Sequence, residues 1–121
     1  MPRGGDIATD ETRNLIAADK VTGTAVYNRQ GDKLGSVYDL MLNKSTGQVA
    51  YAVMSFGGFL GMGESYHPLP WRALTYDARQ DGYVVDIDRR RLEGAPNYTA
   101  SAEPNWSDRT YGQSVDRYYG F

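Results

Sequence analysis

The chain has 121 residues, with 13 Lys and Arg against 15 Asp and Glu, and a net charge of −2. This length corresponds to about one domain, and the charge balance lacks the basic surplus that is typical of nucleic-acid-binding proteins. Because the chain has no cysteine, disulfides and thiolate chemistry are excluded. The sequence has no apolar run of about 18 residues, so we expect no transmembrane segment. No apolar run directly follows Arg3 near the N-terminus, so we expect no signal peptide and a cytoplasmic location.

The composition divides the chain into an N-terminal lead-in over 1–19, a domain over 20–95 and a C-terminal tail over 96–121. Within the domain, turn residues separate short apolar runs about every eight to twelve positions, which is typical of an all-β fold. The expected strands are 24–27, 34–42, 48–56, 66–70 with its continuation 71–76, and 83–87.

These strands predict a small five- to six-stranded antiparallel, partly open β-barrel with a short helical turn and extended termini, because closure removes exposed sheet edges. The polar turn 43–47 predicts an antiparallel hairpin. Pro68 and Pro70 indicate an edge strand, since proline cannot donate to a central ladder. Asp88 is expected to cap the single helical turn over 89–93.

Asp39 interrupts an apolar run in which the alternation slips, which predicts strong twist or a bulge. We expect a buried carboxylate whose oxygens accept backbone N–H groups at the bulge. The alternative is a functional acid with a raised pKa, for which no second acid is obviously paired with Asp39.

The tail is rich in Asn, Ser, Asp and Gly, yet it is also rich in aromatic residues. Disordered segments are usually poor in aromatics, so we expect the tail to dock on the barrel or on a partner subunit. The aromatic residues are Tyr98, Trp106, Tyr111, Tyr118, Tyr119 and Phe121.

An ordered set of motifs carries a resemblance to a known family: the runs 23–31 (GTAVYNRQG), 34–39 (LGSVYD), 56–64 (FGGFLGMGE) and 69–71 (LPW), with Gly47 before a β run. Over residues 20–95 the chain resembles a PRC-barrel domain. The residues expected to have structural roles are Gly31, Gly35, Asp39, Gly47, Gly57, Gly58, Pro70 and Trp71.

The resemblance implies a small β-barrel that works as a docking module. Such a barrel forms the cytoplasmic part of the photosynthetic reaction centre H subunit and the C-terminal domain of a 16S rRNA-processing factor. The chain shows neither the transmembrane helix of the first nor the additional N-terminal barrel of the second, so we expect a stand-alone bacterial member of the family.

Catalytic and cofactor chemistry find little support in the sequence. His67 is the single histidine, and without cysteine a zinc site would need several carboxylates beside it. No serine sits in a Gly-x-Ser-x-Gly elbow. The glycine-rich run 57–63 lacks the Lys-Ser/Thr that a phosphate-binding loop requires. We therefore expect no enzyme activity, no cofactor and no metal.

The same glycine-rich run carries Phe59, Leu60 and Met62, and two interpretations of these side chains stay open. They form an exposed apolar contact loop, or they fold back and plug one end of the barrel. Contact residues are also expected in the tail, at Trp106, Tyr111, Tyr118 and Tyr119.

Three hypotheses for function follow. The first is a non-catalytic adaptor that docks a protein partner, or self-associates as a homodimer, through the Gly57–Gly63 loop and the tail. The alternative is an RNA- or ribosome-associated maturation accessory, for which the run Arg89–Arg91 would supply phosphate contacts; such a run is more often a solvated face paired with neighbouring acids. The third is a small-molecule carrier that uses the barrel mouth.

Overall fold

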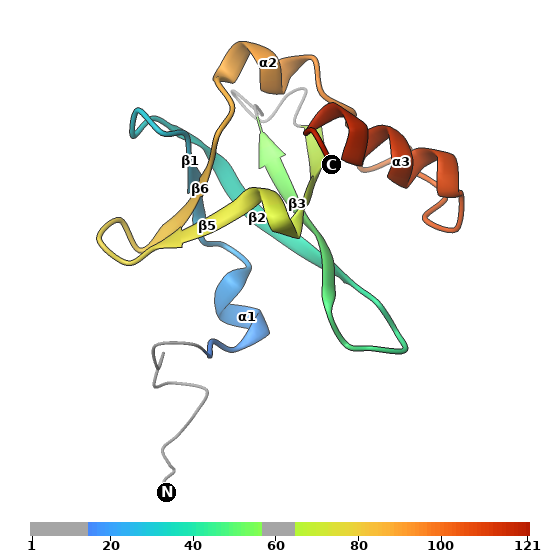
Figure 1. Cartoon of the computed structure of the whole chain (residues 1–121), viewed down its shortest axis with the longest axis horizontal. Coiled ribbons are helices and arrows are strands. Elements are labelled where there is room, and N and C mark those ends of the chain that lie inside the picture. The colour runs from blue at the N-terminus through green and yellow to red at the C-terminus, as the bar shows by residue number, and fades with distance from the viewer. Residues whose placement is uncertain (1–14, 57–64) are drawn as a thin grey trace, which may run out of the picture.

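A computed structural model describes residues 15–56 and 65–121. The chain builds one curled sheet with short helices around it (Figure 1). The strands are β1 (Ala25–Tyr27), β2 (Lys33–Leu42), β3 (Val49–Phe56), β4 (Ser65–Pro70), β5 (Leu74–Asp77) and β6 (Gly82–Val85). The helices are α1 (Ala18–Val21), α2 (Arg89–Glu93) and α3 (Arg109–Tyr118), with a 3-10 turn, η2, over Trp71–Ala73.

The six strands lie in the order β4-β3-β2-β1-β6-β5, which confirms the predicted barrel-like sheet and the hairpin between the second and third strands. Four of the five strand pairs are antiparallel, as predicted. The fifth differs from the prediction, because β1 and β6 run in parallel. A parallel pair needs a long connection, and here the connection consists of the whole remainder of the sheet.

The curl of the sheet follows from its connectivity. The two edge strands, β4 and β5, are consecutive in the chain and are joined by the three residues of η2. A flat sheet of six strands would place its edges about 24 Å apart, at about 4.8 Å per strand spacing, so the sheet must curl to bring β4 and β5 together. Among the described residues no ladder joins these two strands, and the barrel is therefore partly open.

Side chains on the concave side of the sheet fill the barrel. Alternation along β3 turns Ala52, Met54 and Phe56 inward. There they meet residues from all five remaining strands and Leu92 of α2. Met54 and Leu92 are completely buried. Among the described residues this inner core is largely apolar, and the buried polar side chains are Asn28 and His67. Asp88 caps α2 as expected, its Oδ1 accepting the Arg91 N–H at 2.8 Å.

The tail forms a second layer on the convex side of the sheet. Alternation turns Tyr51 and Val53 of β3 outward, and the Tyr51 hydroxyl donates to the Gly112 carbonyl of α3 at 3.4 Å. Val53 and Val115 are fully buried but lie outside the inner core, and α3 packs against β4. Figure 1 shows α3 beside β3, with α1 and α2 at opposite ends of the sheet.

This outer layer corrects one expectation. The prediction gave the chain an extended C-terminus, but residues 109–118 form a ten-residue helix. Asp108 begins it, because its Oδ1 accepts the Thr110 N–H at 2.9 Å. Docking of the tail on the barrel is confirmed.

The bulge predicted near Asp39 is present, since the register of β2 against β3 shifts between Val37 and Asp39. The burial predicted for Asp39 is wrong, because the shift leaves its side chain exposed. Its Oδ1 accepts only a local N–H, that of Leu40, at 2.8 Å.

No helix within the described ranges is long and apolar enough to span a membrane.

Candidate functional site

Four aromatic rings stack in sequence on the convex side of the sheet. The ring of Tyr38 on β2 lies 4.5 Å from that of Tyr66 on β4, centroid to centroid. Tyr66 lies 5.6 Å from Tyr98 of the tail, and Tyr98 lies 6.0 Å from Trp106. We call these four residues the aromatic row.

The strand register sets the first half of the row. Ser36 of β2 faces Ser55 of β3, and Ser55 faces Tyr66 of β4. Because Ser36 and Ser55 have small side chains, the ring of Tyr38 on β2 and the ring of Tyr66 on β4 can meet above β3. The two serine hydroxyls lie 3.4 Å apart and tie β2 to β3 beneath the rings.

The tail supplies the second half by adding a one-residue bridge to the edge of β4. The Tyr66 N–H donates to the Tyr98 carbonyl at 2.8 Å, and the Tyr98 N–H donates to the Tyr66 carbonyl at 3.0 Å. This bridge satisfies backbone groups that an edge strand would otherwise expose, and it fixes the Tyr98 ring against Tyr66.

Trp106 closes the row and connects it to α3. Its indole N–H donates to Glu103 Oε2 at 2.8 Å. Its ring lies 5.7 Å from that of Tyr111 on α3 and 6.3 Å from that of Tyr51 on β3. The row is therefore held at this end by three separate contacts.

Exposure and charge distinguish the row from the inner core. Tyr38 is 54% exposed, and the other three rings are half-buried. Burial and the carboxylate of Glu103, with smaller contributions from Tyr111, Tyr38 and Asp39, raise the pKa of the Tyr98 hydroxyl to about 12. The row is thus a partly exposed aromatic surface in a negative field.

The residues predicted as tail contacts hold the tail on the barrel. Trp106, Tyr111, Tyr118 and Tyr119 are all half-buried. The hydroxyls of Tyr111 and Tyr119 are buried without a hydrogen-bond partner, and burial raises the pKa of both. The Tyr118 hydroxyl donates to the Arg91 carbonyl at 2.5 Å. Contact of these residues with a partner stays a prediction.

Some of the other residues predicted to have structural or contact roles lie in the sheet and its turns, and the rest lie outside the described residues. Gly31 and Gly47 have φ of +91° and +79° at the turns that follow β1 and β2. A Cβ on Gly35 would lie 2.0 Å from the Ser55 carbonyl oxygen, so β2 and β3 could not approach as they do. Pro70 is buried, and half-buried Trp71 packs on Tyr83. Gly57, Gly58, Phe59, Leu60 and Met62 lie outside the described residues.

His67 lies inside the barrel and is 1% exposed. Its Nε2 lies 2.9 Å from Ser65 Oγ, and its ring meets Phe56 edge to face. Among the residues that the structure describes, its Nδ1 finds no hydrogen-bond partner. Burial lowers the pKa of His67 to about 4, so the ring is neutral near pH 7. In residues 15–56 and 65–121, no three His, Asp or Glu side chains are grouped to hold a metal ion.

The arginine run 89–91 is exposed, as expected of a solvated face. The Arg89 guanidinium donates to the Lys33 carbonyl at 2.8 Å, and that of Arg91 donates to the Tyr118 carbonyl at 2.7 Å. Its expected pairing with neighbouring acids takes another form, because Asp88 caps α2 and Asp86 pairs with Arg29 at 3.5 Å. Two of the three guanidinium groups therefore stabilise the protein's own backbone carbonyls.

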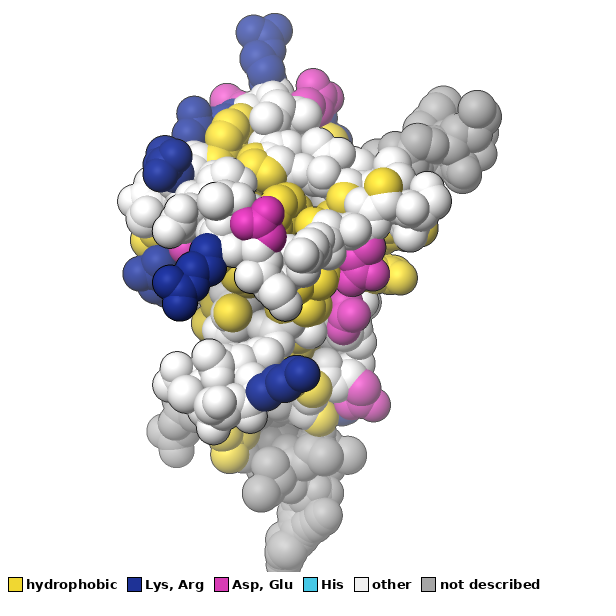
Figure 2. Space-filling model, turned by 90° about the vertical axis from the view of Figure 1, so that its right-hand side faces the viewer, with side chains coloured by type: hydrophobic (Ala, Val, Ile, Leu, Met, Phe, Trp, Pro, Cys, Tyr) yellow, Lys and Arg dark blue, Asp and Glu magenta, His cyan; other side chains and the backbone are white. Residues whose placement is uncertain are grey.

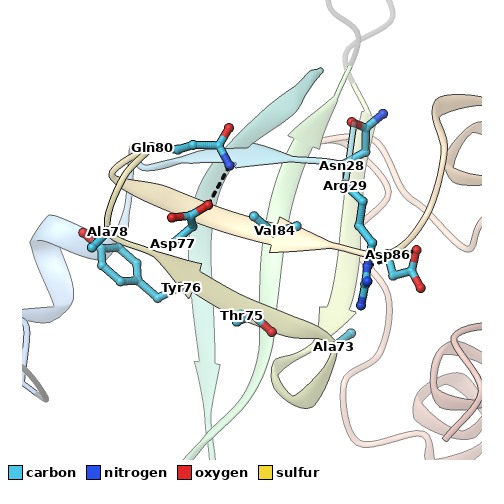
Figure 3. Close-up of a pocket in the computed structure, with 10 residues that line it drawn as sticks. All are labelled: Asn28, Arg29, Ala73, Thr75, Tyr76, Asp77, Ala78, Gln80, Val84 and Asp86. Carbon is cyan, nitrogen blue, oxygen red and sulfur yellow. Dashed lines mark hydrogen bonds and ion pairs between the residues drawn. The ribbon is translucent and has the colours of Figure 1, made fainter. Parts of the chain in front are cut away.

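A hollow of about 470 Å³ lies on the convex side of β5 and β6 (Figure 3). Four of its polar side chains are paired with one another: Gln80 donates to Asp77 at 3.0 Å, and Arg29 lies beside Asp86. In the described part of the chain, none of the buried polar atoms that lack a partner belongs to this hollow. A small-molecule carrier therefore stays a prediction.

The sequence and the geometry lead to the same family. The family model described as PRC-barrel domain matches residues 13–92, which is more than half of the chain. The protein belongs to the PRC-barrel domain family, and the predicted resemblance is confirmed. A comparison with curated proteins gave no match.

Sequence reasoning missed three members of the row, Tyr38, Tyr66 and Tyr98, as contact residues. Tyr38 and Tyr66 lie in strands, and their meeting depends on the register across β3. The available signal was the position of Tyr66 in a proline-containing edge strand, which leaves backbone groups for another segment to pair with.

Proposed function

We propose that the protein is a non-catalytic binding module that docks a protein partner on the aromatic row. The observation that carries this proposal is Tyr38, a tyrosine that is 54% exposed yet stacked at 4.5 Å on Tyr66. Tyr and Trp are enriched at protein interfaces because each offers a large apolar area with a polar edge.

The row is organised before any partner arrives, which supports the proposal. Its rings come from β2, β4 and the tail, and each contacts at least one other ring. Immobilising a side chain on binding costs about 0.5–1.5 kcal/mol. That cost falls when the rings already hold one arrangement in the free protein.

A non-catalytic role is supported by the state of the titratable groups. His67 is buried, neutral near pH 7 and remote from solvent, so it offers no surface to a substrate. Asp39 is exposed and accepts a single local N–H. Neither has the cleft or the second titratable partner that acid–base chemistry uses.

In addition to the row, the Gly57–Gly63 loop and the remaining tail aromatics stay predicted contact residues. Self-association as a homodimer and an RNA partner are the competing outcomes. The row favours a protein, because the carboxylates of Asp39 and Glu103 act on its central ring, Tyr98, and would repel phosphates there.

Affinity capture with the immobilised full chain tests the proposal. Three baits are compared in RNase-treated native lysate: the natural sequence, Tyr38→Ala, and Tyr76→Ala as a matched control. Tyr76 is a tyrosine on β5 with 45% exposure, outside the row. The proposal predicts one protein that the natural chain and Tyr76→Ala retain and Tyr38→Ala loses.

Two results would contradict it. Retention of the same proteins by all three baits would remove the row from binding. Disappearance of every bound species after RNase treatment would replace the protein partner with RNA.

A further inference from the structure

We infer that the aromatic row binds an extended peptide segment of its partner that carries arginine side chains at alternate positions. This inference rests on the proposed function and names the chemistry of the partner. Three observations support it: the charges beside the row, the uncovered rings at its ends, and the spacing of the rings.

A carboxylate lies near each end of the row, and at the Trp106 end Arg109 lines the same hollow as the indole ring. Asp39 follows Tyr38 directly and is exposed. At the other end, Glu103 accepts the indole N–H of Trp106 at 2.8 Å, which fixes one carboxylate beside the ring. Both carboxylates act on the Tyr98 hydroxyl between them and raise its pKa. A cationic side chain placed on the rings would be stabilised from both directions.

Elsewhere the protein covers its own aromatic rings with arginine. Arg72 lies 4.6 Å above the ring of Phe121, and Arg91 lies 4.7 Å above that of Tyr118. Over the parts of the chain that are described, no arginine is stacked in this way on Tyr38 or Trp106. The two ends of the row are therefore available for the same cation–π contact from another chain.

Figure 2 shows the side chains by type over the side of the molecule that carries α3. Hydrophobic side chains run across this face, with most of the basic side chains on its left and most of the acidic ones on its right. A cationic segment would be drawn toward the acidic side and repelled from the basic one.

The spacing of the rings selects the form of the segment. Successive centroids along the row are 4.5, 5.6 and 6.0 Å apart. In an extended chain, side chains on the same face recur about every 6.6 Å, twice the rise of one residue. This repeat is within about 1 Å of the two longer spacings of the row, so arginines at alternate positions fit its tail half best, whereas consecutive arginines would point to opposite faces.

The test uses the full chain and four synthetic peptides of about eight residues, which in extended form are longer than the row and so cover it with residues to spare at each end. The first alternates Arg and Thr, and the second has the same composition with all arginines first. The third alternates Lys and Thr, and the fourth alternates Glu and Thr. Binding is followed by calorimetry and by fluorescence anisotropy of labelled peptides.

The alternating Arg peptide is expected to bind most tightly, with the block Arg peptide weaker by about threefold or more and the Glu peptide not binding. Tyr38→Ala should weaken the alternating peptide by about tenfold, and Tyr38→Phe, which keeps the ring, should restore binding. Asp39→Asn and Glu103→Gln should each weaken it by about threefold. Tyr76→Ala and Asp86→Asn are the matched controls and should leave it unchanged.

Equal binding of the Arg and Glu peptides, or an equal loss with Tyr76→Ala and Tyr38→Ala, would overturn the inference. So would absence of binding by the Arg peptides, or an RNA oligonucleotide that competes for the row. These failures are separate from failure of the proposed function: a captured protein that depends on Tyr38 but presents no arginine-bearing segment would leave that function standing.

Discussion

The barrel interior and the tail layer are two solutions to burying aromatic and aliphatic side chains in one small domain. Inside the barrel, Met54 of β3 and Leu92 of α2 are fully buried, and the other strands contribute buried or partly buried side chains around them. In the tail layer, Val53 and Val115 are equally buried, but the rings around them keep polar atoms and exposed edges. The interior holds the fold, and the outer layer is the part on which we propose that a partner docks.

The difference also concerns the polar groups that each region hides. The described interior buries His67, which burial keeps neutral, and Tyr83, whose pKa burial raises. The outer layer buries tyrosine hydroxyls, two of them without partners, and ties Trp106 to Glu103. Polar groups at a half-exposed surface cost less to bury and supply specificity. The predictions below test this contrast.

The largest effect is expected from a cavity in the interior. Leu92→Ala should lower the free energy of unfolding by about 3 kcal/mol, because it removes a completely buried side chain. Urea denaturation measures the change, and Leu42→Ala, at a leucine that is 53% exposed, is the control, with a change within about 0.5 kcal/mol. Similar losses in both variants would contradict a packed interior.

A loss of stability in acid is expected from His67. Its pKa is about 4 in the folded protein and about 6.5 in the unfolded chain, so the unfolded chain binds more protons between these values. Stability is therefore complete above about pH 6.5, falls by about 3 kcal/mol as the pH drops toward 4, and levels off below it.

Unfolding of the natural chain and of His67→Phe, measured in urea at several pH values, checks this prediction. The variant should lose most of the pH dependence between about 6.5 and 4, and its residual slope reports the carboxylates. Parallel pH profiles for the two proteins would show that His67 is not protected from protonation.

A smaller effect is expected from the outer layer. Val115→Ala should cost about 2 kcal/mol, since a fully buried valine of α3 loses its packing against the sheet. Hydrogen exchange should show lower protection for residues 109–118 and unchanged protection in β2 and β3. Loss of protection in both regions at once would mean that the two layers unfold as a unit.

The N-cap of α3, Asp108, gives the next contrast. Asp108→Ala should destabilise by about 1 kcal/mol, because its carboxylate caps the Thr110 N–H. Thermal unfolding of this variant should be compared with Asp108→Asn, which keeps an acceptor and should lose much less. Equal loss from both would assign the effect to charge instead of the hydrogen bond.

The sequence predicted the interior far better than the outer layer. Alternation along 48–56 is a local property, so it identifies β3 and its inward residues directly. The bulge at Asp39 was visible as a slip in that alternation, but its exposure was not, because a bulge changes which face a side chain occupies. The parallel pairing of β1 with β6 depends on how the whole sheet curls.

The tail was harder because its signals are weak one by one. Tyr111, Val115 and Tyr118 recur at helical spacing, and Asp108 precedes them as a cap. This pattern was overlooked within a segment rich in Asn, Ser and Gly. The aromatic row was not predictable from any single segment, since Tyr38, Tyr66 and Tyr98 meet only after the strands and the tail are in place.

The smallest effect on stability should accompany the largest effect on binding. Tyr38→Ala removes a ring that is more than half exposed, so it should change the free energy of unfolding by no more than about 0.5 kcal/mol. Urea denaturation of this variant is the check. A loss of about 2 kcal/mol or more would mean that the row supports the fold and is not held ready for a partner.

Site-specific photo-crosslinking tests the central claim most directly. The photoreactive residue p-benzoylphenylalanine is placed at position 38 in one protein and at position 76 in another, and both are irradiated in native lysate. We predict a discrete protein adduct from position 38 that position 76 does not form, joined to an arginine-bearing peptide of the partner. Adducts from position 76 alone, or adducts from position 38 with RNA only, would contradict a protein-docking surface on the aromatic row.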